Sequence, residues 1–163
     1  MRLALPLALS AVVLALTAVS PASAAERQEL PFLLETDLPR SACLDSNASG
    51  NAYLGDCYSG NPYMRWTWVS SGKYRGMLRS VGTGRCLDSN ASGDVYTSEC
   101  HANNNYENWI YWNEGNKRFS FENVATGLCL SSNYSLDPHF PGPTRVFTQD
   151  CSGAVRWLAR TVS

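Results

Sequence analysis

Three units of similar sequence follow one another in this chain, and their spacing limits its fold more than any other feature. The first cysteine of each unit stands at position 43, 86 or 129, an interval of 43 residues each time. The octet CLDSNASG occurs twice, beginning at Cys43 and at Cys86. A repeat of this length indicates one small supersecondary structure built several times, with neighbouring copies completing a shared core.

Each unit has the pattern of short strands. The segments NAYLGDC, DVYTSEC and TRVFTQDC alternate with period two, and RWTWV, NWIYW and RWLAR are aromatic or β-branched runs of strand length. No window after residue 24 supports a long amphipathic helix. We therefore expect an all-β domain of about 12 short strands, four per unit, that closes on itself and leaves few free strand edges.

The six cysteines all follow the first 24 residues, and their spacing repeats as the units do. The two cysteines of a unit are 14, 14 and 22 positions apart. This repetition favours disulfides within units, namely Cys43 with Cys57, Cys86 with Cys100, and Cys129 with Cys151. Zinc is the alternative use of these cysteines, but the chain has no Cys-x-x-Cys pair and only two histidines, His101 and His139.

The N-terminal segment has the pattern of a secretory signal peptide. Arg2 precedes an apolar run and an Ala-x-Ala cleavage pattern at 22–24. A retained membrane anchor is the alternative, although Pro6 interrupts the run and its length is marginal for a bilayer. We expect a secreted protein with a signal peptide at 1–24, a short extension at 25–33 and a single domain at 34–163.

The charge of the exported part argues against two classes of partner. One of the 13 basic residues, Arg2, lies in the leader, so 12 basic and 14 acidic residues remain. These charges form no block of one sign, as a nucleic-acid or anionic-membrane surface would require. We expect no nucleic-acid partner, no membrane insertion, and a monomer.

The third unit carries an insert, SLDPHFPGPT, at 135–144. Its three prolines and its glycine predict a surface loop.

The repeats resemble those of a known family. The Cys-Leu-Asp start, the strand that ends in a second cysteine and the tryptophan that follows resemble the ricin-B-type β-trefoil lectins. Within that group GRCLDSNASGDVYT followed by NYENW is most similar to actinohivin-like repeats. The resemblance covers 34–163 and implies a pseudo-threefold β-trefoil. It also implies that Trp66, Trp109 and Trp157 lie in the shared core, where a large indole packs well if its N–H finds a partner.

The same resemblance implies a sugar pocket in each of the first two units. Neutral sugars are bound by planar acceptors that take two vicinal hydroxyls and by aromatic rings that pack against C–H faces. The family's hydroxyl-binding carboxylate matches Asp45 and Asp88, and its two tyrosines match four tyrosines here. An inserted residue lets Asn61 and Asn104 replace the family's asparagine. The expected carbohydrate-binding residues are Asp45, Tyr53, Asn61, Tyr63, Asp88, Tyr96, Asn104 and Tyr106.

Two departures from the family pattern limit this expectation. The third unit has Ser131, Phe147 and Ala154 where the others have the aspartate and the two tyrosines, so we expect no pocket there. The family's glutamine two residues before each tryptophan is replaced by Met64, Glu107 and Val155. The resemblance implies mannose-rich glycans as ligands, with galactose-containing glycans as the alternative.

The octet itself admits other interpretations. Asp, Asn and Gly are turn residues, and Gly50 and Gly93 permit positive φ. The segment from Asp88 to Glu99 also satisfies an EF-hand calcium pattern, although a cysteine on either side of it suits a hairpin better than two helices. The sequons at Asn47, Asn90 and Asn133 are glycan acceptors if the source cell glycosylates.

We expect no enzyme, no cofactor and no resident metal. The chain has no Gly-x-Ser-x-Gly motif and no histidine in a catalytic motif, and the cysteines are assigned to disulfides. The alternative to a lectin is a degenerate β-trefoil that acts as a protein-interaction module or as a protease inhibitor, with the insert of the third unit as its reactive loop.

Overall fold

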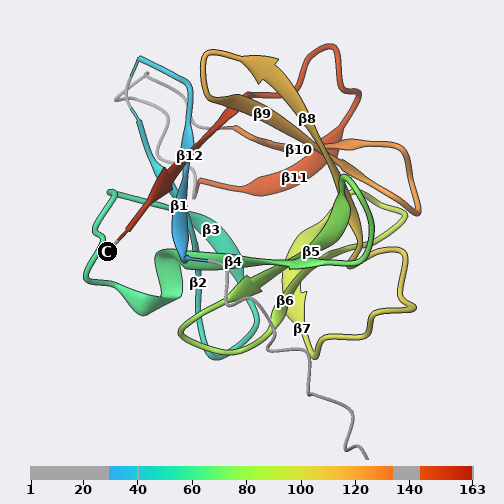
Figure 1. The fold of residues 1–163 in the computed structure, drawn as a ribbon, viewed down its shortest axis with the longest axis horizontal. Coiled ribbons are helices and arrows are strands. Elements are labelled where there is room, and N and C mark those ends of the chain that lie inside the picture. Colours follow the sequence, from blue (N-terminus) through green and yellow to red (C-terminus); the bar gives the residue numbers. More distant parts are fainter. Residues whose placement is uncertain (1–29, 40, 134–143, 163) are drawn as a thin grey trace, which may run out of the picture.

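The computed structural model describes residues 30–39, 41–133 and 144–162, and twelve strands lie in this part of the chain (Figure 1). Unit 1 contains β1 (Phe32–Thr36), β2 (Cys43–Ser46), β3 (Ala52–Gly55), the 3-10 turn η1 (Pro62–Met64) and β4 (Arg65–Ser70). Unit 2 contains β5 (Arg75–Ser80), β6 (Cys86–Ser89), β7 (Val95–Ser98) and β8 (Trp109–Gly115). Unit 3 contains β9 (Arg118–Asn123), β10 (Cys129–Ser132), β11 (Val146–Gln149) and β12 (Trp157–Thr161).

Six of these strands form a closed antiparallel ring. The order is β1, β4, β5, β8, β9 and β12, and β12 returns to pair with β1 from Phe32–Thr161 to Thr36–Trp157. Each unit contributes its first and last strand to this barrel. A closed ring leaves no free edge among its six strands, which is how a small all-β domain avoids edge-to-edge association.

The other six strands form three hairpins, β2–β3, β6–β7 and β10–β11, at one end of the barrel. Single bridges join the hairpins in a triangle: Asn51 with Tyr96, Asp94 with Phe147, and Tyr53 with Arg145. The result is a β-trefoil with one four-stranded lobe per unit, so the all-β fold predicted from the repeat is confirmed.

The glycine that ends each octet joins one hairpin to the next. Gly50 and Gly93 have φ of 90° and 84°, in the left-handed region that favours glycine. Their carbonyls accept the backbone N–H of Thr97 at 2.7 Å and of Thr148 at 2.8 Å. A Cβ at either glycine would lie 3.0 Å from the backbone oxygen of that threonine. The octet recurs in part because the same junction between hairpins is built twice.

The three repeated tryptophans form the centre of the core, as the resemblance implied. Each is fully buried, and each indole N–H donates to a backbone carbonyl of its own unit at 3.0 Å. The acceptors are Leu44, Leu87 and Leu130, whose side chains are fully buried in the same cluster. Three equivalent bonds therefore hold the three hairpins to the barrel in the same way.

Three disulfides join Cys43 to Cys57, Cys86 to Cys100 and Cys129 to Cys151, the pairs that the spacing predicts. Each one ties the start of a hairpin to the loop that follows it. Within the described residues, no helix has the length and apolar character to cross a membrane. The insert at 135–144 lies outside the described residues except for Thr144, whose hydroxyl donates to the Leu54 carbonyl at 3.0 Å.

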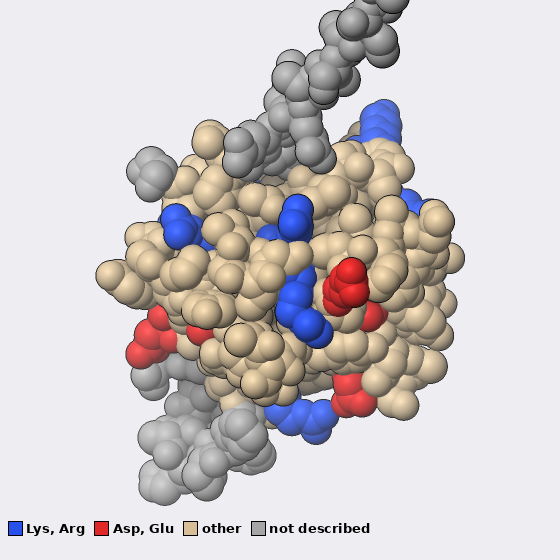
Figure 2. All heavy atoms as spheres, turned by 90° about the horizontal axis from the view of Figure 1, so that it is seen from below, with Lys and Arg blue, Asp and Glu red and all other residues tan. Residues whose placement is uncertain are grey.

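On the face shown in Figure 2, lysine and arginine side chains are interspersed with aspartate and glutamate. No patch of a single sign gathers on that face, as expected from the balanced composition.

Candidate functional site

The β2–β3 and β6–β7 hairpins place an aspartate directly opposite a tyrosine. Asp45 pairs in register with Tyr53, and Asp88 pairs with Tyr96. Directly opposed residues of an antiparallel pair project from the same face. The structure therefore brings these four predicted residues together as two matching pairs.

Both aspartates are held by the backbone of the following residue. The Ser46 N–H donates to Asp45 Oδ1 at 2.8 Å, and the Ser89 N–H donates to Asp88 Oδ1 at 2.8 Å. Each aspartate is 5% exposed, and burial is the main cause that raises the pKa of both carboxyls. One carboxylate oxygen is thus fixed by the fold, and the other, Oδ2, is the oxygen that differs between the units.

The opposed tyrosines also occupy matching positions. The Tyr53 hydroxyl donates to the Ser46 carbonyl at 3.3 Å, and the Tyr96 hydroxyl donates to the Ser89 carbonyl at 3.3 Å. Burial and then the neighbouring aspartate charge raise the pKa of both phenols. Each phenol therefore stays protonated beside its carboxylate and can offer a hydroxyl to a ligand.

In unit 1 the loop after the disulfide brings an asparagine to the aspartate. Asn61 accepts the Tyr63 N–H at 3.0 Å through Oδ1, which caps the η1 turn, and its Nδ2 lies 3.4 Å from Asp45 Oδ2. The Tyr63 side chain is 36% exposed, and its backbone carbonyl accepts the Ser46 hydroxyl at 3.2 Å. Asp45, Tyr53 and Asn61 thus lie together at one carboxylate, and the loop that carries Tyr63 is joined to the same hairpin through Ser46.

In unit 2 the corresponding asparagine turns to a different carboxylate. Asn104 again accepts the backbone N–H two residues on, from Tyr106 at 3.0 Å, but its Nδ2 donates to Glu107 Oε1 at 2.9 Å. Asp88 Oδ2 instead accepts the Ser98 hydroxyl at 2.9 Å. Tyr106 is 37% exposed, much like Tyr63 in unit 1. Asn104 is therefore linked to Asp88 only through Glu107 and Ser98.

Glu107 is the centre of unit 2 that the sequence interpretation missed. It is 1% exposed, and its carboxylate contacts the backbone N–H of His101 at 2.6 Å and the Ser98 hydroxyl at 3.2 Å. The His101 ring lies 3.4 Å away, and its hydrogen bond to Glu107 is the main cause that raises the imidazole pKa. The sequence did hold a signal for this cluster. Met64 occupies the same position in unit 1, and a glutamate in the place of an apolar residue needs polar partners if it is buried.

Unit 3 has the same hairpin, but the residue at the aspartate position is bonded to other residues of its own unit. Ser131, at the aspartate position, is fully buried and accepts hydrogen bonds from Gln149 Nε2 at 2.9 Å and from the Val155 N–H at 3.2 Å. Its opposed residue is Phe147, which has no hydroxyl. At these two positions, therefore, the third lobe offers neither a carboxylate nor a phenol to a ligand.

Nothing in the described residues resembles a metal centre. The residues described by the structure contain no group of three or more His, Cys, Asp or Glu side chains placed to hold a metal ion. The EF-hand pattern that begins at Asp88 lies on the β6–β7 hairpin instead of between two helices. Within it the Asn90 side chain accepts the backbone N–H groups of Ser92 and Asp94, which makes it a turn.

Residues 34–157 match the family described as the ricin-type beta-trefoil lectin domain. The chain belongs to this family. Ricin-type lectin domains bind carbohydrate and are not themselves catalytic, so membership supports a carbohydrate-binding role for this chain. No curated protein matches the sequence.

Solved structures share the trefoil at low identity. The designed threefold-symmetric protein ThreeFoil is 19% identical with a TM-score of 0.67, over 80% of this chain and 99% of that one. The Haemophilus ducreyi cytolethal distending toxin is 15% identical with a TM-score of 0.64, over 81% and 84%. An exo-beta-1,3-galactanase from Clostridium thermocellum is 15% identical with a TM-score of 0.67, over 82% of this chain but 30% of that enzyme. These likenesses show the fold.

Proposed function

We propose that this ricin-type lectin is a secreted protein that binds the hydroxyls of glycans at two sites, one in unit 1 and one in unit 2. The observation that supports it most is the paired geometry of Asp45 with Tyr53 and of Asp88 with Tyr96. The two pairs have the same register and the same backbone anchor. Unit 3 lacks both groups, so the pair is not a requirement of the fold.

The proposed mechanism assigns a different task to each group. The aspartate Oδ2 accepts a sugar hydroxyl, because Oδ1 is already held by a backbone N–H. The opposed tyrosine and the asparagine bind neighbouring hydroxyls. The rings of Tyr63 and Tyr106, about one third exposed, pack against the C–H face of the sugar. The carboxylate and the asparagine caps are in place before the sugar arrives, which lowers the ordering cost of binding.

Two weak sites on one rigid body favour branched or clustered glycans. A single shallow sugar site has a Kd near 1 mM, about −4 kcal/mol. Two such sites engaged together can raise avidity by about two to four orders of magnitude when the glycan spans them. We propose mannose-rich glycans as the ligand class, with galactose-containing glycans as the alternative.

Three observations support secretion. The chain carries three disulfides, which form and persist in oxidising compartments. Its first 24 residues have the pattern of a signal peptide. Lectins of this family act on glycans, and these are abundant outside cells.

A glycan array tests the proposal. The proteins compared are the wild type, Asp45→Ala, Asp88→Ala, the double variant, and Tyr74→Phe as a control at an exposed tyrosine in the loop between β4 and β5. We expect each single variant to lose avidity for clustered glycans by about tenfold or more, and the double variant to lose all binding. The control should bind as the wild type does.

Three results would contradict the proposal. They are the absence of wild-type binding to any mannose-rich or galactose-containing glycan, undiminished binding by the double variant, and loss of wild-type binding in EDTA, which would indicate a metal-dependent site. Far-UV and near-UV circular dichroism of each variant separates loss of the site from loss of the fold.

A further inference from the structure

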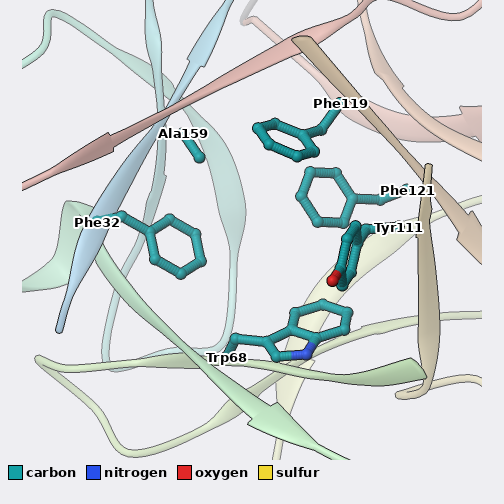
Figure 3. Close-up of a pocket in the computed structure, with 6 residues that line it drawn as sticks. All are labelled: Phe32, Trp68, Tyr111, Phe119, Phe121 and Ala159. Atoms are coloured by element: carbon teal, nitrogen blue, oxygen red, sulfur yellow. The ribbon is translucent and has the colours of Figure 1, made fainter. Parts of the chain in front are cut away.

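A cavity separate from the two proposed sugar sites lies at the end of the barrel away from the hairpins. It is a cavity of about 270 Å³ between β1, β4, β8, β9 and β12, and Figure 3 shows the side chains around it. Its floor is Phe121, which is 4% exposed, and the residues around its mouth are half-buried. The lining residues are Phe32, Trp68, Tyr111, Phe119, Phe121 and Ala159.

The threefold symmetry of the barrel explains why the cavity exists. Three positions lie two residues after the core tryptophans, and they hold Trp68, Tyr111 and Ala159. Two units therefore place a large aromatic ring at this level of the barrel, while the third places a methyl group. The unfilled space corresponds to the ring that unit 3 does not supply.

A second small residue at this level leaves no such space. On one side of each core tryptophan, the residue paired with it in the neighbouring strand is Phe32, Gly76 or Phe119. Gly76 is covered by the indole of Trp68, because a Cβ there would lie 2.7 Å from a ring carbon. Ala159 lines the cavity itself. The space left by the small side chain of Ala159 is therefore not filled by a neighbouring ring.

The lining is aromatic, uncharged and fixed in place. The rings of Trp68 and Tyr111 meet edge to face with centroids 5.3 Å apart, and Tyr111 meets Phe119 in the same way at 6.1 Å. Such pairs hold each ring in one orientation, so the cavity is formed before a ligand arrives. A sugar would find no carboxylate or amide among the lining side chains for its hydroxyls.

The charge at the edge of this aromatic cluster argues against a cationic ligand. The Lys73 ammonium lies 5.0 Å from the centroid of the Tyr74 ring, and Tyr74 meets the ring of Tyr111 edge to face at 5.6 Å. A quaternary ammonium could otherwise use the ring faces. Here it would approach a cation already bound to the same cluster, so a neutral ligand is favoured.

We propose that this cavity binds a small uncharged aromatic molecule of one or two rings, which takes the place of the side chain that unit 3 lacks. An apolar cavity of about 150 Å³ stays dry and binds benzene, so a cavity nearly twice that size has room for a bicyclic ring. The site is separate from the two sugar sites, since it shares no residue with them.

Binding of indole by the mature protein tests the proposal, with isothermal titration calorimetry as the measurement. We expect saturable binding by the wild type and a loss of at least tenfold in affinity in Ala159→Trp, which restores the symmetric ring. Tyr58→Phe, a change at an exposed tyrosine in the loop after β3, should leave indole binding unchanged. If Ala159→Trp does not fold, Ala159→Leu is used in its place.

Competition experiments identify the ligand class. Indole should not be displaced by tetramethylammonium or by methyl mannoside. Displacement by the first would assign the cavity to cations, and displacement by the second would merge it with the sugar sites. Either displacement would overturn the proposal. So would the absence of saturable indole binding by the wild type, or indole binding of wild-type affinity by the folded Ala159 variant. We expect the Ala159 variant to keep its glycan binding. The sugar-site proposal and the cavity proposal can then be tested independently of each other.

Discussion

The sites of unit 1 and unit 2 share the octet CLDSNASG but differ in what surrounds the aspartate. In unit 1 the carboxylate of Asp45 has one weak side-chain amide partner, Asn61, at 3.4 Å. In unit 2 Asp88 has a closer hydroxyl partner, Ser98, which it shares with the buried carboxylate of Glu107. The site of unit 1 has a single acid beside a tyrosine and an asparagine, and the site of unit 2 has a network of two acids.

The difference originates outside the octet. The counterparts of Ser98 and Glu107 in unit 1 are Gly55 and Met64, and the methyl group of Met64 occupies the space beside Gly55. The octet fixes the backbone and the position of the aspartate. The residues 10 and 19 positions after the octet's aspartate determine how strongly that aspartate is held, so identical motifs can carry unequal sites.

The largest expected effect comes from giving unit 2 the residue of unit 1. Glu107→Met removes the acceptor of the partly buried His101 N–H and of the Asn104 amide, while the Ser98 hydroxyl keeps Asp88 as its acceptor. We expect the free energy of unfolding to fall by about 2–4 kcal/mol, because each partly buried donor left unpaired is costly. Urea denaturation measures it. Glu107→Gln keeps one acceptor oxygen and is the control, and equal losses in both variants would contradict the network.

A gain in stability is expected from Asp88→Asn. Burial and then the charge of Glu107 raise the pKa of Asp88, so the folded protein binds this proton more tightly than the unfolded chain does. The stability from this group is full below the unfolded pKa of about 4 and is lost as pH rises through the folded pKa.

The free energy of unfolding of Asp88→Asn should therefore exceed that of the wild type by about 0.5–2 kcal/mol at pH 7, and the two should be nearly equal at pH 3. Denaturation at both pH values measures it. Asp45→Asn should gain less, since its amide would face the Asn61 amide. A loss of stability in Asp88→Asn at pH 7 would show that the charge is stabilising.

The two tyrosines should respond alike. Tyr53→Phe and Tyr96→Phe each remove a hydroxyl that donates to a serine carbonyl at 3.3 Å. We expect each to cost about 0.5–1.5 kcal/mol, since the bond is long and partly exposed. Thermal unfolding measures both losses of stability. If one loss is more than twice the other, the two hairpins are not equivalent.

The smallest effect concerns the pH range of binding by unit 2. Glu107→Gln removes a negative charge that raises the pKa of Asp88, so the pKa falls and the carboxylate stays ionised at lower pH. In an Asp45→Ala background, sugar binding should then persist to lower pH than with Glu107 present. A titration of glycan binding from pH 7 to pH 3 measures it, and an unchanged acid limit would separate Glu107 from the site.

The fold could be predicted because the 43-residue repeat extends over the whole domain and so specifies how its three units are arranged. Repeated Trp66, Trp109 and Trp157 require one environment three times, and repeated cysteine spacings require the same local loop. The network around Glu107 could not be predicted in the same way, since it depends on which side chains a loop turns inward. The barrel-end cavity was missed because Ala159 is informative only after its partners in the ring are known.

The pairing of β12 with β1 has a consequence for how the protein is made. The first strand of the ring has its partner at the far end of the chain, from Phe32–Thr161 to Thr36–Trp157. The barrel therefore cannot close before β12 has been synthesised, and β1 must wait for a partner about 120 residues away in the chain. A short C-terminal truncation that removes β12 should thus be as harmful as a core mutation.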